Sequence, residues 1–125
     1  MKTCLIVDDS RVVRAIARRF IEAVGFTVGE AGDGQLAVVA CQQQMPDVVL
    51  LDWNMPVMTG IEFLRHLRVQ DGGDKPVVIM CTTEKDVSHI QEAITAGANE
   101  YLVKPFDQDT LTAKFSKAGL VGCPA

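Results

Sequence analysis

Residues 46–56 read PDVVLLDWNMP, and every position of Val48–Leu51 is apolar. A half-buried strand alternates apolar and polar side chains, so an unbroken apolar run predicts a strand that is covered on both faces. Strands of this kind occur in parallel sheets that have helices on each face. The run ends at Asp52, where loop signals begin and continue to Gly60. We therefore predict a central strand here, with an acidic side chain at its carboxyl end.

On both sides of this run, short apolar stretches alternate with longer segments in which apolar residues recur every three or four positions. The predicted strands are Thr3–Val7, Phe26–Glu30, Val48–Leu51, Pro76–Met80 and Glu100–Val103, and the predicted helices are Ser10–Val24, Gln35–Gln43, Ile61–Val69, Glu84–Ala96 and Asp107–Ala118. Strict alternation of five such pairs predicts an α/β fold, a doubly wound five-stranded parallel sheet with five helices. A chain of 125 residues has the length of one domain, so we expect residues 1–125 to form a single domain with no output domain.

Composition excludes several classes of protein. The formal charge of -4 lacks the basic surplus of a nucleic-acid binder. No apolar run reaches the roughly 20 residues of a membrane-spanning helix, and the amino terminus becomes acidic too early for a secretory signal. The four cysteines form no CxxC pair, and Cys4, Cys41 and Cys81 stand among apolar residues, as buried free thiols do. We expect a cytoplasmic protein that binds no nucleic acid and inserts into no membrane.

Polar side chains follow four of the predicted strands. Right-handed crossovers place the carboxyl ends of all parallel strands along one edge of the sheet, where ligands of open α/β sheets bind. The residues at this edge are Asp8, Asp9, Asp52, Asn54, Thr82, Thr83 and Lys104. Taken singly, each fits an ordinary helix cap, turn residue or loop lysine. Their joint placement at one edge instead predicts a functional site.

Three carboxylates at close range repel one another unless a cation compensates them, and Mg²⁺ prefers such oxygen ligands. We expect Asp9 and Asp52 to hold Mg²⁺ together with the main-chain carbonyl of Asn54, and Asp8 to act through water or a further oxygen contact. Asp52 is the candidate nucleophile, because a carboxylate can accept a phosphoryl group as an acyl phosphate. Lys104 would then pair with a phosphoryl oxygen.

The same segments resemble the receiver domains of bacterial response regulators, and most closely the stand-alone chemotaxis type. The resemblance covers essentially the whole chain, and its motifs are LIVDDS at 5–10, LLDWNMPVMTG at 50–60, Thr82 at a strand end and GANEYLVKPF at 97–106. It implies the strand order 2-1-3-4-5 and a cis peptide at Lys104–Pro105. It also implies that a sensor histidine kinase or phosphotransfer protein phosphorylates Asp52, with Mg²⁺ bound nearby.

The resemblance further implies that Thr82 and Tyr101 form a conformational switch. From the residues alone, Tyr101 fits equally well as a core residue of the last strand. The implied output is protein–protein binding, through the face formed by the last two predicted helices and the strand between them, roughly Lys85 to Lys117. We expect a monomer that catalyses only its own phosphorylation and dephosphorylation and is otherwise not an enzyme.

Thr83 departs from the family, which usually has Ala or Gly there, and a larger side chain is expected to narrow access to Asp52. Glu84 and Asn54 resemble the chemotaxis members and flank the expected path of the hydrolytic water. Three rival classes stay open: an aspartyl-phosphate phosphatase, a flavodoxin-like electron carrier, and a receiver that signals without phosphate. Against the phosphatase, this chain has Asn54 where such enzymes usually have a second Asp. Against the electron carrier, this chain has no phosphate-binding loop after the first predicted strand.

Several other side chains have plainer interpretations. We interpret Trp53 and Met55 as loop packing, and the two histidines, His66 and His89, as surface residues. The arginines of the first predicted helix form either a solvated face or a docking surface for an acidic partner; they are Arg11, Arg14, Arg18 and Arg19.

Overall fold

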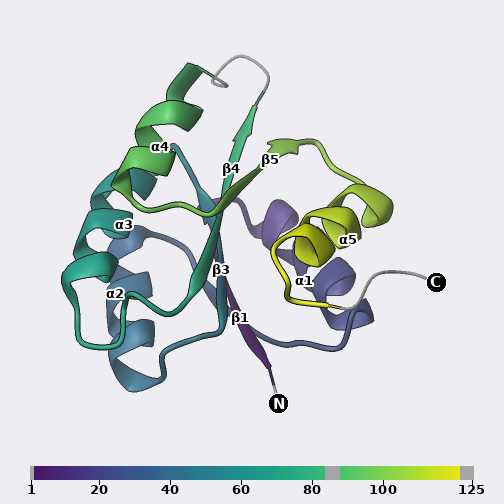
Figure 1. Ribbon diagram of the computed structural model, residues 1–125, viewed down its shortest axis with the longest axis horizontal. Coiled ribbons are helices and arrows are strands. Elements are labelled where there is room, and N and C mark those ends of the chain that lie inside the picture. Colours follow the sequence, from purple (N-terminus) through teal and green to yellow (C-terminus); the bar gives the residue numbers. More distant parts are fainter. Residues whose placement is uncertain (1, 84–87, 122–125) are drawn as a thin grey trace.

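A computed structural model describes residues 2–83 and 88–121 of the chain. One parallel sheet contains the five strands in the order β2-β1-β3-β4-β5 (Figure 1). The strands are β1 (Thr3–Val7), β2 (Thr27–Ala31), β3 (Val48–Asp52), β4 (Val77–Thr83) and β5 (Glu100–Lys104). The helices are α1 (Arg11–Ala23), α2 (Gly34–Gln43), α3 (Gly60–Val69), α4 (Ile90–Ala96) and α5 (Gln108–Lys117). The predicted fold class and strand order are confirmed.

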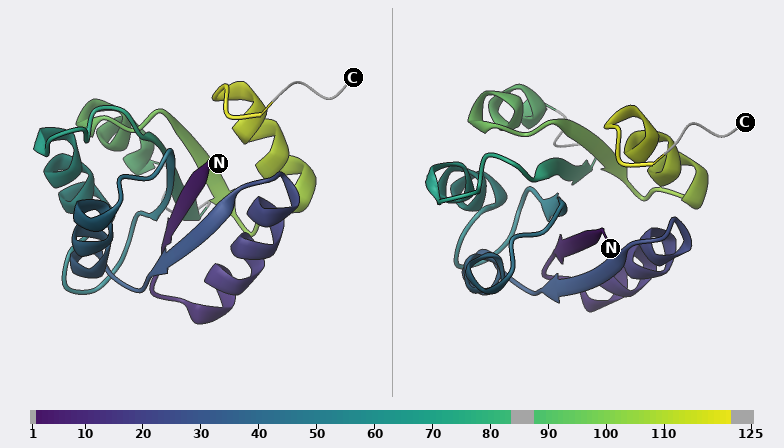
Figure 2. Two further views of the ribbon diagram at one scale, coloured as in Figure 1. Left: turned by 90° about the horizontal axis from the view of Figure 1, so that it is seen from below. Right: turned by 60° about the horizontal axis from the view of Figure 1, so that its bottom comes forward.

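Helices cover both faces of the sheet, as the unbroken apolar strand predicted. Helices α1 and α5 lie on one face, and α2, α3 and α4 lie on the other (Figures 1 and 2). Successive residues of β3 enter different cores: Val48 and Leu50 pack with α1 and α5, whereas Val49 and Leu51 pack with the other three helices. The strand is therefore buried along its whole length, which fixes the position of Asp52 at its end.

Helix starts follow local capping signals. The side chains of Ser10, Asp33, Thr59 and Asp107 each accept a hydrogen bond from a backbone N–H in the first turn of the helix that follows. Thr59 and Glu62 complete a capping box at α3. These caps place the starts of four helices at the carboxyl edge of the sheet, beside the predicted site.

Four strands, β2 to β5, run further toward the carboxyl edge than the sequence predicted. The β3–β4 ladder includes Asp52 opposite Cys81, and the β4–β5 ladder includes Thr82 and Thr83, the latter opposite Lys104. The backbone ladder continues past the apolar run because its hydrogen bonds do not depend on side-chain polarity. The acceptor candidate, the hydroxyl residues and the lysine are thus held by the sheet itself.

The fourth predicted helix, Glu84–Ala96, was wrong at Ser88 and His89. Helix α4 begins at Ile90, where its apolar pattern starts, and Ser88 and His89 form a 3-10 turn before it. Residues 84–87 lie outside the described residues, and Glu84 and Lys85 are among them.

The cysteine prediction is confirmed for the three thiols that are described. Cys4, Cys41 and Cys81 are free and buried, and burial raises the pKa of the Cys41 thiol to about 11.

Candidate functional site

Two of the three carboxylates at the sheet edge are buried. Asp8 is 3% exposed and Asp52 is 6% exposed, whereas Asp9 faces solvent. One carboxylate oxygen from each of the three lies within 4.8 Å of the others, at the ends of β1 and β3. Such a set of oxygen donors suits a hard divalent cation such as Mg²⁺. Asn54, whose main-chain carbonyl was the fourth expected ligand, is exposed two residues beyond Asp52.

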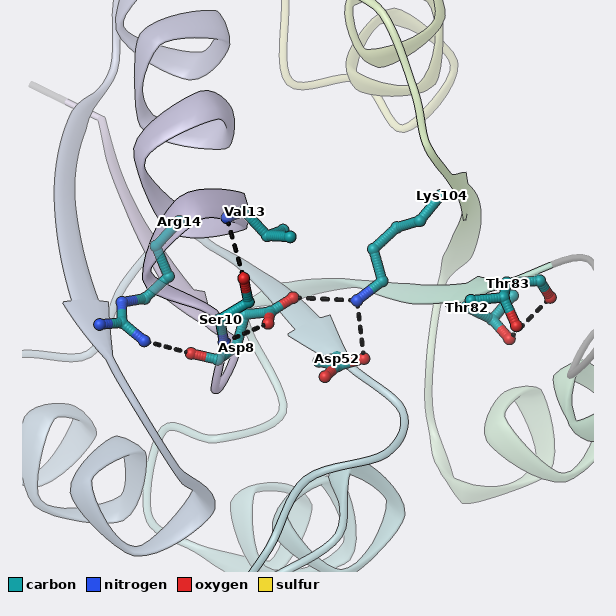
Figure 3. A network of polar contacts seen from close by, with 8 residues as sticks. All are labelled: Asp8, Ser10, Val13, Arg14, Asp52, Thr82, Thr83 and Lys104. Atoms are coloured by element: carbon teal, nitrogen blue, oxygen red, sulfur yellow. Dashed lines mark hydrogen bonds and ion pairs between the residues drawn. The ribbon is translucent and has the colours of Figure 1, made fainter.

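Lys104 bridges the two buried acids. Its Nζ atom donates to Oδ2 of Asp8 and to Oδ1 of Asp52, at 3.1 Å in both cases (Figure 3). Burial alone would lower the pKa of Lys104, but the two carboxylates outweigh it and raise that pKa above its usual value. The ammonium group therefore stays charged and partly neutralises the acidic pair.

The electrostatics of Asp52 differ from those of an exposed acid. Burial, followed by the negative charge of Asp8, raises the pKa of Asp52 to about 6, while Lys104 and the backbone N–H of Asn54 oppose the rise. The carboxylate is consequently ionised at neutral pH and poorly solvated, which leaves it in need of a cation.

Asp8 is held by the start of α1. Its Oδ1 atom accepts a hydrogen bond from the backbone N–H of Ser10 at 2.9 Å, and its main-chain carbonyl accepts from Arg14 at 2.6 Å (Figure 3). Arg14 also pairs with Glu30 on β2 at 3.0 Å. Asp8 is thereby oriented with one oxygen left for Lys104.

The expected switch residues lie on one face of the sheet but have different surroundings. Thr82 is 2% exposed, and its hydroxyl donates to the carbonyl of Thr83 at 3.3 Å. Tyr101 is half-buried on β5, with the Nζ atom of Lys114 4.2 Å from its ring centroid. The register pairs Thr82 with Val103, two residues along β5 from Tyr101. The structure thus brings Asp8, Asp9, Asp52 and Lys104 together and gives Tyr101 a separate setting.

An apolar hollow of about 360 Å³ adjoins Lys104. Its lining residues are Val13, Ile16, Thr83, Lys104, Pro105 and Phe106. The peptide bond between Lys104 and Pro105 is cis, as the resemblance implied. Thr83 borders this hollow with an exposed side chain, so its expected influence on access to Asp52 stays a prediction.

The arginines of α1 are not one uniform face. Arg14 and Arg18 both pair with Glu30, at 3.0 and 2.7 Å, whereas Arg11 and Arg19 are exposed. Two of the four therefore serve to attach α1 to β2.

Sequence reasoning missed one aromatic contact beside the site. The imidazole of His89 stacks on the indole of Trp53 with ring centroids 3.9 Å apart and planes 19° apart. His66 is exposed, as predicted, but His89 is more than a surface residue. No local signal links the two rings, because they belong to different loops of the sheet edge.

Comparison with known proteins agrees with this geometry. Residues 4–116 match the response regulator receiver domain family. The chain is 40% identical over 114 residues to the chemotaxis protein CheY of Pseudomonas aeruginosa. The aligned residues cover 90% of this chain and 92% of that protein. It is also 40% identical to CheY-3 of Vibrio cholerae, over 90% of this chain and 88% of the relative.

Solved structures give the same result. The chemotaxis response regulator CheY4 of Vibrio cholerae superimposes with a TM-score of 0.87 at 37% identity, covering 94% of this chain and 98% of that one. The receiver domain of the sensor histidine kinase PA1611 from Pseudomonas aeruginosa, with magnesium coordinated in its active-site cleft, has a TM-score of 0.84 at 28% identity, over 93% and 95% of the two chains.

The chain belongs to the response regulator receiver family. It is a CheY-like receiver domain of two-component signalling. Among the described residues, no helix is both long and apolar enough to span a bilayer.

Proposed function

We propose that the protein is a single-domain response regulator that accepts a phosphoryl group on Asp52 in the presence of Mg²⁺. One observation carries this proposal: three carboxylates offer oxygens within 4.8 Å of one another, and Lys104 lies 3.1 Å from two of them. The donor is a sensor histidine kinase or a phosphotransfer protein. The magnesium described in the PA1611 receiver domain supports the choice of metal.

Each residue has a distinct part in the transfer. Asp8, Asp9, Asp52 and the main-chain carbonyl of Asn54 would hold the metal, which when bound supplies positive charge against the phosphoryl oxygens. A carboxylate oxygen of Asp52 forms the new bond to phosphorus as the bond to the donor nitrogen breaks. Lys104 exchanges its contact with Asp52 for one with a phosphoryl oxygen.

The expected output is a change of shape. A phosphoryl group adds about -1.5 to -2 charges, which gives the hydroxyl of Thr82 a strong new acceptor. Movement of Thr82 would let Tyr101 turn inward and alter the face made by α4, β5 and α5, where a downstream target binds. We propose a cytoplasmic monomer that signals by protein contact and performs no chemistry beyond its own phosphorylation and dephosphorylation.

The first test is the intact mass of the protein after incubation with a small phosphodonor and Mg²⁺. We expect one phosphoryl adduct in the native protein and none in Asp52→Asn or in the absence of Mg²⁺. An adduct that persists in Asp52→Asn would place the acceptor elsewhere. Release of phosphate over many cycles from a generic phosphomonoester would instead favour the phosphatase class.

A further inference from the structure

The stacked pair of Trp53 and His89 joins two loops that approach the site from different strands. Trp53 stands between Asp52 and Asn54, in the segment that follows β3, whereas His89 precedes α4. The centroid distance of 3.9 Å and the interplanar angle of 19° describe face-to-face contact of the two rings. The contact therefore links the acceptor segment directly to the start of α4.

Two hydrogen bonds hold the backbone of Trp53 in place. The N–H of Trp53 donates to the carbonyl of Cys81 on β4 at 3.0 Å, and the carbonyl of Trp53 accepts from Gly60 at the start of α3 at 3.1 Å. The indole also packs against the apolar core on the α2–α4 side of the sheet. The position of the indole is thus tied to the backbone of the acceptor segment.

The imidazole occupies the position that normally caps a helix. His89 is the N-cap residue of α4 and its side chain makes no capping hydrogen bond, unlike the cap residues of the other four helices. Its ring contacts Trp53 instead. Within the described residues, the start of α4 therefore contacts the acceptor segment through this aromatic pair.

A weaker ionic contact lies beside the stack. Nδ1 of His89 is 3.9 Å from Oε2 of Glu92, and Oε1 of Glu92 is 3.8 Å from Arg65 on α3. The Glu92 side chain is 52% exposed, and long exposed pairs of this kind contribute little. The stack is the stronger connection.

We propose that His89 is a positioning residue that transmits changes at the acceptor site to α4 through Trp53. This inference rests on the proposed function, because metal or phosphoryl binding at Asp52 and Asn54 is what would displace the indole between them. It adds a path to the output face that is separate from Thr82 and Tyr101. The path depends on a flat ring at position 89 and not on its charge.

The test compares native protein with His89→Ala, His89→Phe, Glu92→Gln and the matched control His66→Ala. Trp53 is the only tryptophan, so its emission reports the stack. Amide hydrogen exchange of residues 90–96 reports the start of α4, and intact mass reports phosphorylation. All are measured with Mg²⁺ alone and with Mg²⁺ plus a small phosphodonor.

We expect His89→Ala to shift the Trp53 emission to longer wavelength. We also expect it to lower the protection of α4 amides against hydrogen exchange by roughly 2- to 10-fold, which corresponds to the free energy of one aromatic pair. The response of α4 to Mg²⁺ and phosphodonor should shrink several-fold in His89→Ala and remain native in His89→Phe and His66→Ala. Equal adduct yields would show that phosphorylation itself is intact.

A native α4 response in His89→Ala would overturn the proposal. So would an equal loss in Glu92→Gln, because the ionic contact would then be responsible. If no variant, native protein included, forms an adduct, the proposed function fails, and the Mg²⁺ arm alone then decides whether the stack transmits to α4.

Discussion

Two buried carboxylates share one ammonium group at the carboxyl edge of the sheet. Lys104 contacts both Asp8 and Asp52, yet the pKa of Asp52 is still raised to about 6. One lysine is therefore insufficient compensation for the two acids. Removing an acidic charge and removing the lysine charge at this site should therefore change the stability of the protein in opposite directions.

Removal of the Asp52 charge should stabilise the metal-free protein. Its pKa is about 6 in the folded protein against roughly 3.9 unfolded, so the folded form binds the proton more tightly. The resulting stability is fully present below about pH 4 and is lost as pH rises through about 6. At about pH 7.5 without Mg²⁺, Asp52→Asn should raise the free energy of unfolding by about 1–2 kcal/mol.

Urea unfolding of native protein and Asp52→Asn at about pH 4 and about pH 7.5 measures this difference in the free energy of unfolding. Asp71→Asn, at an exposed loop position, is the matched control and should leave stability unchanged. A less stable Asp52→Asn protein at the higher pH would contradict the expected sign.

Removal of the Lys104 charge should have the opposite effect. Lys104→Met leaves the carboxylates of Asp8 and Asp52 without their ammonium partner, at an expected cost of about 3 kcal/mol. Added Mg²⁺ should restore part of that loss, because the cation can bind the same oxygens. Urea unfolding with and without Mg²⁺ tests both effects. Lys75→Met, at an exposed loop position, is the control, and an equal loss there would argue against the electrostatic explanation.

Among the elements, the junction of β3 and α3 leaves no room for a side chain at Gly60. A Cβ atom at Gly60 would overlap the main-chain carbonyl oxygen of Asp52, so the first residue of α3 must be glycine for the helix to begin against the acceptor strand. The capping box of Thr59 and Glu62 then fixes the direction of the helix. The position of the acceptor thus depends on the start of a neighbouring helix.

Gly60→Ala should destabilise the protein by about 2 kcal/mol or more, because the backbone of the acceptor strand has to move. Gly29→Ala on β2 is the matched control: its Cβ would meet its nearest neighbour at 3.7 Å, an ordinary contact. We expect the control to stay within about 0.5 kcal/mol of native in thermal or urea unfolding. Equal stability of the two variants would show that the junction has room to relax.

In the molecule as a whole, Arg68 joins segments that are distant in the sequence. From the end of α3, its guanidinium donates to the carbonyls of Gly73, Pro76 and Gly97 and to the side chain of Asn99, at 2.8 to 3.1 Å. The loops before β4 and β5 are thereby attached to one side chain. This network lies at the end of the sheet opposite the acceptor site.

Arg68→Met should cost about 3 kcal/mol, because several backbone carbonyls lose their donor at once. Phosphorylation of Asp52 should remain, because the network lies away from the site. Arg65→Met, which removes an exposed pair at 3.8 Å, should cost less than about 0.5 kcal/mol. Urea unfolding and intact mass measure the two properties, and a stable Arg68→Met protein would contradict the assigned role.

Much of the fold could be read from local patterns. The apolar run Val48–Leu51 predicted a strand buried on both faces, and the alternation of segments predicted the doubly wound sheet. The predicted start of the first helix at Ser10 was also accurate, because Ser10 caps α1 and a cap acts within one turn of chain. Strand ends were less accurate: the apolar pattern stopped before Thr82 and Lys104, although the backbone ladder continued through both.

By itself, the sequence determined the fold class, the acids and lysine at one sheet edge, and the resemblance that supplied the strand order. Only the tertiary structure decided that Lys104 bridges Asp8 and Asp52, that His89 stacks on Trp53, and that Arg68 joins two distant loops. The physical reason is the distance along the chain over which each interaction acts. Side-chain periodicity reports which face of a segment is buried, whereas contacts between distant segments depend on how whole elements pack against one another.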